Sequence, residues 1–106
     1  MLLKGKKILY KDWIYTWLLE KKDYIKESTY ANYSNNIFNH IIPKLGNYYL
    51  NELNHKIIQD FLLELSKNGR KDNNGGLAEK TIKDITIIIK GSIKKGINED
   101  KIKHIE

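Results

Sequence analysis

Apolar side chains recur at helical spacing along most of this chain. The first set falls at i, i+3, i+4, i+7 and i+8, which is the pattern of one buried helix face. Its members are Tyr10, Trp13, Ile14, Trp17 and Leu18. Comparable sets follow in three later segments, and no convincing strand pattern accompanies them. Helices that each bury one face must pack on one another, so the chain is predicted to be an all-α four-helix bundle.

The second predicted helix has the clearest ends. Ser28 is its expected N-cap, because a serine hydroxyl can accept a hydrogen bond from a main-chain N–H of the first turn. The helix is expected to end near Ile41, since Pro43 cannot continue the hydrogen-bond pattern and Gly46 permits a turn. The first predicted helix spans residues 10–22.

The third and fourth predicted helices follow the same rules. Asn54 is the expected N-cap of the third helix, which runs to about Lys67. The fourth spans about residues 79–95, and Gly96 is expected to close it. A polar, glycine-rich segment at residues 67–76 joins the two helices and is predicted to be the longest loop.

The second helix carries a polar face without formal charge. No carboxylate occurs between Ser28 and Asn51, although 30% of the whole chain is charged. The face is made of amides and hydroxyls: Ser28, Asn32, Asn35, Asn36 and Asn39. Such a surface suits the approach to phosphates and base edges, where a carboxylate would be repelled.

The overall charge points the same way. The net charge of +6 favours an anionic partner, most often nucleic acid, with an anionic membrane as the lesser option. A basic domain with solvated lysines is the alternative explanation, and the excess of Lys, Ile and Asn is also typical of an A+T-rich genome. No apolar run approaches the roughly 20 residues of a membrane span, and the absence of cysteine favours an intracellular setting and excludes thiolate metal sites.

Signatures of catalysis and of cofactor binding are missing. The three histidines lack the i, i+4 spacing of a zinc site, and they are His40, His55 and His104. No strand precedes Gly75 and Gly76, and no Gly-Lys-Ser or Gly-Lys-Thr sequence follows them as a phosphate loop requires. Asp60 and Glu64 lie four residues apart and are best explained as a solvated acidic face. We therefore expect no catalytic residue, no metal and no cofactor.

A binding surface remains. No carboxylate occurs between Ile85 and Asn98, so most of the fourth helix is also free of acids. The candidate contact residues of the second helix are Ser28, Thr29, Asn32 and Asn36, and those of the fourth are Lys80, Thr81, Lys83, Ile87, Lys90 and Lys94. Asparagine can pair bidentately with adenine, while lysines and hydroxyls hold the register on phosphates.

The order of these features resembles the N-terminal core-binding (SAM-like) domain of tyrosine recombinases, the phage-type integrases. The resemblance covers roughly residues 8–100. It rests on Trp13 and Trp17, on Ser28-Thr29 with Tyr33, Ile37, Ile41, Pro43, Leu45 and Gly46, on Leu50-Asn51-Glu52-Leu53 leading into Ile57-Ile58-Gln59-Asp60-Phe61, and on Leu77-Ala78-Glu79-Lys80-Thr81-Ile82. Ala78 departs from the family pattern, which often has a serine cap there.

The resemblance implies a four-helix bundle that forms half of a C-shaped clamp on double-stranded DNA. Its second and fourth helices would face the major groove at the core or attachment site. The DNA-contacting role would then fall to Lys26, Ser28, Thr29, Asn32, Asn36, Lys80, Thr81, Lys83 and Lys90, with Lys94 on the same face. Other recombinase protomers would be partners through the full-length protein, which would be cytoplasmic and encoded by a bacterium or phage.

The resemblance also implies how the chain is divided into segments and which role it has. Residues 1–9 are expected to be an N-terminal extension, residues 10–96 the core-binding domain, and residues 97–106 the start of a linker to a separate catalytic domain. The chain itself is expected to be non-catalytic and to act in DNA integration and recombination as part of a longer recombinase. Two other functions stay open: a basic helical module that binds proteins, and a stand-alone DNA-binding regulator.

Overall fold

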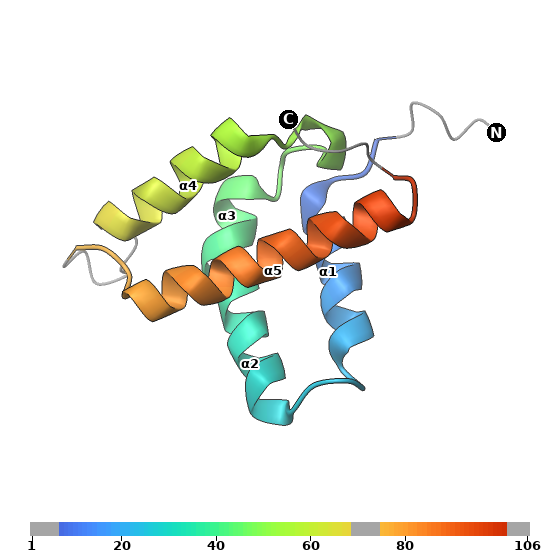
Figure 1. The fold of residues 1–106 in the computed structure, drawn as a ribbon, viewed down its shortest axis with the longest axis horizontal. Helices are drawn as coiled ribbons and strands as arrows, with labels where there is room; N and C mark the ends of the chain where they lie inside the picture. The colour runs from blue at the N-terminus through green and yellow to red at the C-terminus, as the bar shows by residue number, and fades with distance from the viewer. Residues whose placement is uncertain (1–6, 69–74, 102–106) are drawn as a thin grey trace.

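The computed structural model describes residues 7–68 and 75–101, and it confirms the predicted all-α fold (Figure 1). Four longer helices dominate: α1 (Tyr10–Lys21), α2 (Glu27–Asn36), α4 (His55–Asn68) and α5 (Glu79–Asn98). Shorter elements connect them: the π-helical turn η1 (Ile37–Ile41), α3 (Ile42–Leu45) and the 3₁₀ turn η2 (Leu50–Glu52). No helix in the described ranges is both long and apolar enough to cross a membrane.

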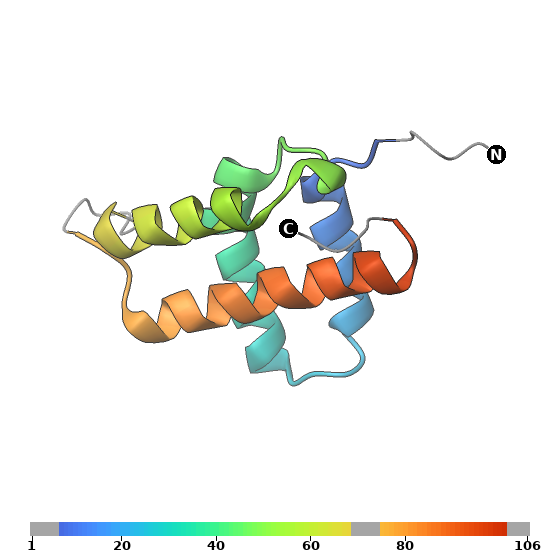
Figure 2. The same ribbon diagram turned by 45° about the horizontal axis from the view of Figure 1, so that its top comes forward.

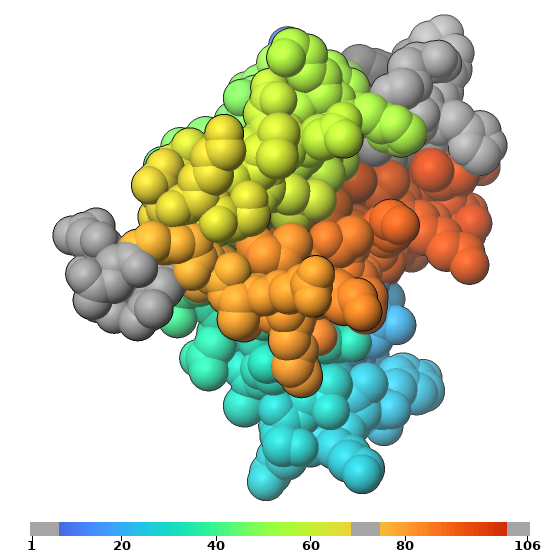
Figure 3. Space-filling view, turned by 60° about the vertical axis from the view of Figure 1, so that its left-hand side comes forward, coloured from blue at the N-terminus to red at the C-terminus, as the bar shows by residue number. Residues whose placement is uncertain are grey.

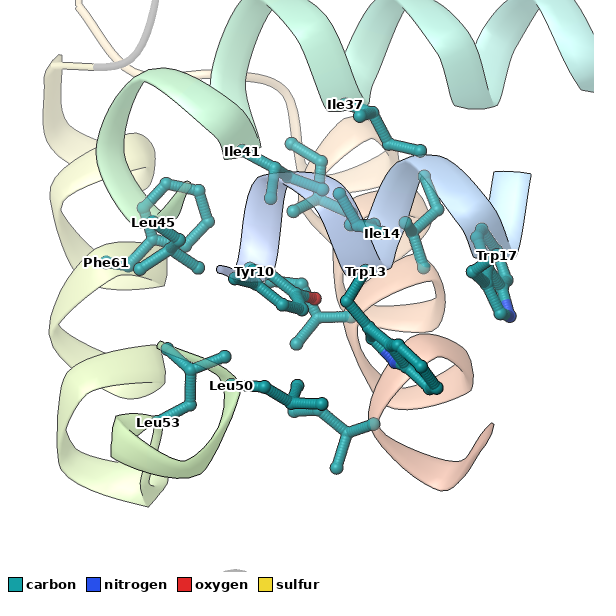
Figure 4. Close-up of a cluster of buried hydrophobic side chains, with 14 of the residues drawn as sticks. Tyr10, Trp13, Ile14, Trp17, Ile37, Ile41, Leu45, Leu50, Leu53 and Phe61 are labelled. Carbon is teal, nitrogen blue, oxygen red and sulfur yellow. The ribbon is translucent and has the colours of Figure 1, made fainter. Parts of the chain in front are cut away.

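Helix α1 is the centre of the core. Its predicted apolar stripe is fully confirmed, because Tyr10, Trp13, Ile14, Trp17 and Leu18 are all buried. Figure 4 shows the labelled side chains of this stripe among core residues from the other helices. The start of α1 is held in place by main-chain hydrogen bonds to the segment after α3, and Leu9 and Tyr49 form an antiparallel β-bridge there.

Residues 27–45 form one run of helical turns, so the prediction of a helix end near Ile41 was wrong. At η1 the chain widens into a π turn, in which the N–H of Ile42 donates to the carbonyl of Ile37, five residues earlier. The α-helical pattern then restarts, which puts Pro43 in the first turn of α3. A proline is tolerated there because an N–H in that turn needs no partner in its own helix.

Gly46 ends α3 through close packing. Its φ angle is −62°, an ordinary helical value, so no left-handed conformation is involved. A Cβ atom at this position would lie 2.6 Å from the carbonyl oxygen of Ile42 and 3.0 Å from Cβ of Lys11 in α1. The glycine therefore allows the end of α3 to approach α1 closely.

The predicted cap of α4 is confirmed, and the predicted end of α5 was wrong. Asn54 Oδ1 accepts a 2.9 Å hydrogen bond from the N–H of Ile57, as an N-cap should. Helix α5 continues past Gly96, which is buried inside it, and ends at Asn98. Ile97 packs against the core, so the extra turn buries apolar surface that would otherwise be exposed. Most of the predicted long loop, residues 69–74, lies outside the described residues.

Helix α5 lies across α1 and α2 and runs beside α4 (Figures 1 and 2). The crossing is tight because Gly91 has no side chain. A Cβ atom there would lie 2.9 Å from Cζ2 of Trp17, whose ring stacks on Tyr33 of α2 with centroids 5.6 Å apart. The inner side of α5 thus closes the core while its outer side stays free for contacts.

Candidate nucleic-acid interface

The outer side of α5 carries a row of cations with one apolar residue among them. We call this row the lysine ridge, and it consists of Lys83, Ile87, Lys90 and Lys94, all exposed. These positions follow one another at intervals of four, three and four residues, which keeps them on one helix face. None of the three ridge lysines forms an ion pair within residues 7–68 and 75–101. Their charges are therefore available to an external anion.

Other lysines of α5 are engaged within the domain. Lys80, predicted to contact DNA, forms a 3.1 Å ion pair with Asp84, although its side chain is 84% exposed. Lys95 is nearly buried and pairs with Glu20 at 3.2 Å and Glu99 at 2.7 Å. Burial alone would lower the pKa of Lys95, but the hydrogen bonds to Glu99 and Glu20 outweigh it and raise that pKa above its usual value.

The first two turns of α2 present a second set of predicted contact residues. Lys26 is the N-cap of α2, so the expectation that Ser28 caps this helix was wrong. The Lys26 backbone is already extended at φ −65° and ψ 154°, so the helix starts two residues earlier than the capping pattern indicated. Lys26, Ser28 and Asn32 are exposed and Thr29 is half-buried, and we call these four residues the α2 polar strip.

Asn36 is the one buried residue among those predicted to contact DNA. Its side chain is buried, with 6% of the residue exposed, and its Nδ2 donates a 3.3 Å hydrogen bond to Oδ1 of Asn32 one turn earlier. Asn36 is therefore placed to orient the exposed amide of Asn32. Thr81, on the first turn of α5, is half-buried.

The lysine ridge and the α2 polar strip belong to helices that pack against each other. In Figures 1 and 2, α5 crosses α2 and the first turns of α2 project beyond the crossing. The space-filling view of Figure 3 shows both helices reaching the same side of the molecule, with α4 on the far side of α5 from the start of α2. The fold thus brings near one another two segments that are 51 to 68 residues apart in sequence.

The acids of α4 form a surface of their own. Asp60 pairs with Lys56 at 3.1 Å, and Glu64 is exposed one turn later. Leu63 lies exposed between them, at 52%. This arrangement agrees with the predicted solvated acidic face, and it gives α4 an exposed apolar residue that can be compared with Ile87.

A groove between α4 and α5 is the feature that sequence reasoning missed. It has a volume of about 630 Å³. Its apolar lining is Ile58, Leu62, Ile89, Ile93 and Ile97, and its polar lining is His55, Gln59, Thr86, Lys90, Lys94 and Asn98. The sequence did contain a signal for this groove, because the apolar stripe of each helix is wider than the contact between α4 and α5 requires. Two ridge lysines therefore also border an apolar recess.

The described part of the chain holds no cluster of three potential metal-ligating side chains. His55 is the one histidine among the residues that line the groove, and His104 lies outside the described residues. Within residues 7–68 and 75–101, the surface of α2 and α5 presents lysines, hydroxyls and amides.

Comparison with known protein families shows to which family the chain belongs. The sequence profile described as "Phage integrase, N-terminal SAM-like domain" matches residues 9–66, more than half of the chain. The chain belongs to this family. Its membership confirms the resemblance seen in the sequence and gives the chain a role related to tyrosine recombinases. No curated protein and no solved structure matches the chain.

The matched segment of the integrase domain ends inside α4. It includes the α2 polar strip but not α5, so the lysine ridge lies outside it. Family membership therefore supports the scaffold from α1 into α4. The candidate role of α5 in binding rests on its exposed lysines and on its packing against α2.

Proposed function

We propose that this integrase domain binds double-stranded DNA, with the lysine ridge of α5 and the α2 polar strip facing the duplex. The observation that carries the proposal is the lysine ridge itself. Three cations stand on one helix face without an internal ion pair in the described ranges, on the side of the molecule where α2 presents hydroxyls and an amide. Lysines of this kind hold phosphates, and an exposed helix of this width fits the major groove.

In this proposal each group has a stated role. Lys83, Lys90 and Lys94 contact phosphates as point charges, and Lys26 does so from the start of α2. Ser28 and Thr29 fix the register on the backbone, while Asn32, oriented by Asn36, reads an adenine edge. The domain would act as one half of a clamp on the core site of a tyrosine recombinase, whose chemistry lies in another domain.

A salt titration tests the proposal. The isolated domain should bind duplex DNA with a micromolar or weaker dissociation constant, because lysines supply mainly phosphate contacts and only one half of the clamp is present. The slope of log K against log salt should steepen by about 0.9 for each phosphate contact. Binding that is independent of salt, or no binding at low salt, would count against DNA as the partner.

A protein partner is the second candidate, and the groove between α4 and α5 favours it. An apolar recess bordered by Lys90 and Lys94 fits an acidic, amphipathic segment. If the domain fails to bind DNA at low salt but self-associates or binds another part of the recombinase, this second function is the better one.

A further inference from the structure

Ile87 is an exposed apolar residue in the middle of a cationic helix face. It lies four residues after Lys83 and three before Lys90, and 56% of it is exposed. Its neighbours explain the exposure. A helical side chain leans toward the N-terminus, so the residue four positions later normally covers part of it. At Ile87 that later residue is Gly91, which has no side chain to do so.

Gly91 cannot easily be replaced by a residue that would cover Ile87. The space for a Cβ is already taken by the Trp17 ring, 2.9 Å away. The crossing of α5 over α1 thus fixes a glycine one turn after Ile87. As a result no side chain of α5 covers the isoleucine from the following turn, and more than half of the residue stays exposed.

We infer that Ile87 contacts the 5-methyl group of thymine in the major groove, and this inference rests on the proposed DNA binding by α5. A lone exposed isoleucine needs no explanation on most surfaces. Here its neighbours Lys83, Lys90 and Lys94 are suited to phosphates, so a docked duplex would bring a base edge to the position between them. The one apolar group that base pairs present in the major groove is the thymine methyl.

The inferred contact leads to a prediction about affinity that does not depend on the lysines. Removing the thymine methyl removes one apolar group from contact while leaving every phosphate and hydrogen-bonding atom of the duplex in place. Burial of one methyl is worth about 0.8 kcal/mol, which corresponds to about a fourfold change in affinity. A cytosine methylated at C5 carries its methyl at the same place in the major groove and should raise affinity for a G·C duplex by a similar factor.

The experiment compares duplexes that are about two helical turns long: alternating d(AT), alternating d(AU), alternating d(GC) and its 5-methylcytosine form. Each is titrated with the domain and with the Ile87→Ala and Leu63→Ala variants. Leu63 is the matched control, because it is a similarly exposed apolar residue on α4, outside the lysine ridge. Both substitutions are on exposed helix positions where alanine is well tolerated.

The expected result is that the parent domain and Leu63→Ala bind d(AT) about fourfold more tightly than d(AU), whereas Ile87→Ala binds both alike. Differences of shape between the two duplexes would persist in Ile87→Ala, so the variant separates shape from contact. Equal binding of d(AT) and d(AU) by the parent domain, or an unchanged ratio in Ile87→Ala, overturns the inference but leaves DNA binding intact. Failure to bind any of the duplexes at low salt overturns both.

Discussion

The indole Nε1 of Trp13 donates a hydrogen bond to the main-chain carbonyl oxygen of Ser92, 2.8 Å away. The same serine accepts or donates a 2.6 Å hydrogen bond with the hydroxyl of Tyr10, and its Oγ lies 2.9 Å from the carbonyl of Ile89. Two side chains of α1 are thus fixed to one residue of α5. This buried polar contact sets the register of α5 over α1, and with it the positions from which the lysine ridge points outward.

Substitutions at either end of the Tyr10–Ser92 hydrogen bond should have unequal effects on stability. Ser92→Ala leaves the buried Tyr10 hydroxyl without its partner, so we expect a loss of about 1–3 kcal/mol. Tyr10→Phe leaves Ser92 still bonded to Ile89 and should cost only about 0.5–1.5 kcal/mol. Denaturant unfolding of the two variants measures the difference, and a larger loss in Tyr10→Phe would contradict this assignment.

The domain should lose stability at alkaline pH. Burial raises the pKa of Tyr10, and the carboxylates of Glu99 and Glu20 raise that of Lys95 despite its burial. A pKa raised by folding contributes stability that is fully present below the unfolded-state value, about 10 for tyrosine and lysine, and is lost as the pH rises through the folded-state value. Melting temperatures should therefore be steady from neutral pH to about pH 10 and fall above it. Tyr10→Phe should show a shallower fall, and an identical fall in both proteins would exclude Tyr10 as a cause.

The two sides of α5 should separate binding from folding. Lys83→Ala and Lys90→Ala should each reduce the salt slope of DNA binding by about 1 and leave the melting temperature almost unchanged. Ile85→Ala, at a fully buried position of the same helix, should instead cost about 2–5 kcal/mol of unfolding free energy. Lys56→Ala on α4 is the control lysine, and an equal loss of binding there would show that the effect is general charge rather than the ridge.

Asn32 and Asn36 should differ in the way they affect DNA binding. Asn32→Ala should lower affinity for a preferred sequence by about 1–3 kcal/mol and affect a scrambled duplex less. Asn36→Ala removes a buried amide, so it should lower the melting temperature as well and weaken sequence preference only through Asn32. Titrations of both variants on both duplexes provide the test. Equal losses on the two duplexes would mean that Asn32 only contacts the backbone.

Gly91→Ala should destabilise the domain even though alanine favours helices. The added methyl must displace the Trp17 ring, which is buried and stacked on Tyr33. Such overpacking costs about 1–3 kcal/mol, against a gain of about 1 kcal/mol in helix propensity. Thermal melting followed by circular dichroism measures the net loss. The double variant Gly91→Ala/Trp17→Phe should lose less stability than the sum of the losses in the two single variants, because the smaller ring leaves room for the methyl.

Much of the fold could be predicted from the sequence because the burial pattern is helical throughout. The α1 stripe was predicted residue by residue, and the Asn54 cap was correct, since both depend on neighbours within one helix. The errors occurred at predicted helix ends, where a single capping or breaking residue did not decide the boundary. Ser28 and Pro43 are typical of helix ends. The helix nevertheless begins before Ser28, and helical turns continue past Pro43 after the chain widens at η1. Gly96 is likewise absorbed into α5 because Ile97 gains burial.

The candidate site was predictable in its charge and not in its detailed geometry. The spacing of Lys83, Lys90 and Lys94 was enough to place them on one face. That Lys80 is paired with Asp84 and that Asn36 is buried are consequences of side-chain geometry, which the sequence does not record. The groove required the relative placement of α4 and α5, which no single-helix pattern contains.

The contact between Trp17 and Gly91 has a practical consequence. The indole ring lies against α5 at Gly91, which follows Lys90 directly and Ile87 by one turn, and it is screened from water. Its fluorescence depends on the polarity and closeness of its surroundings. Any bending or shift of α5 when the outer side is occupied therefore changes the light that this ring emits, so the domain carries its own optical reporter of binding without an attached dye.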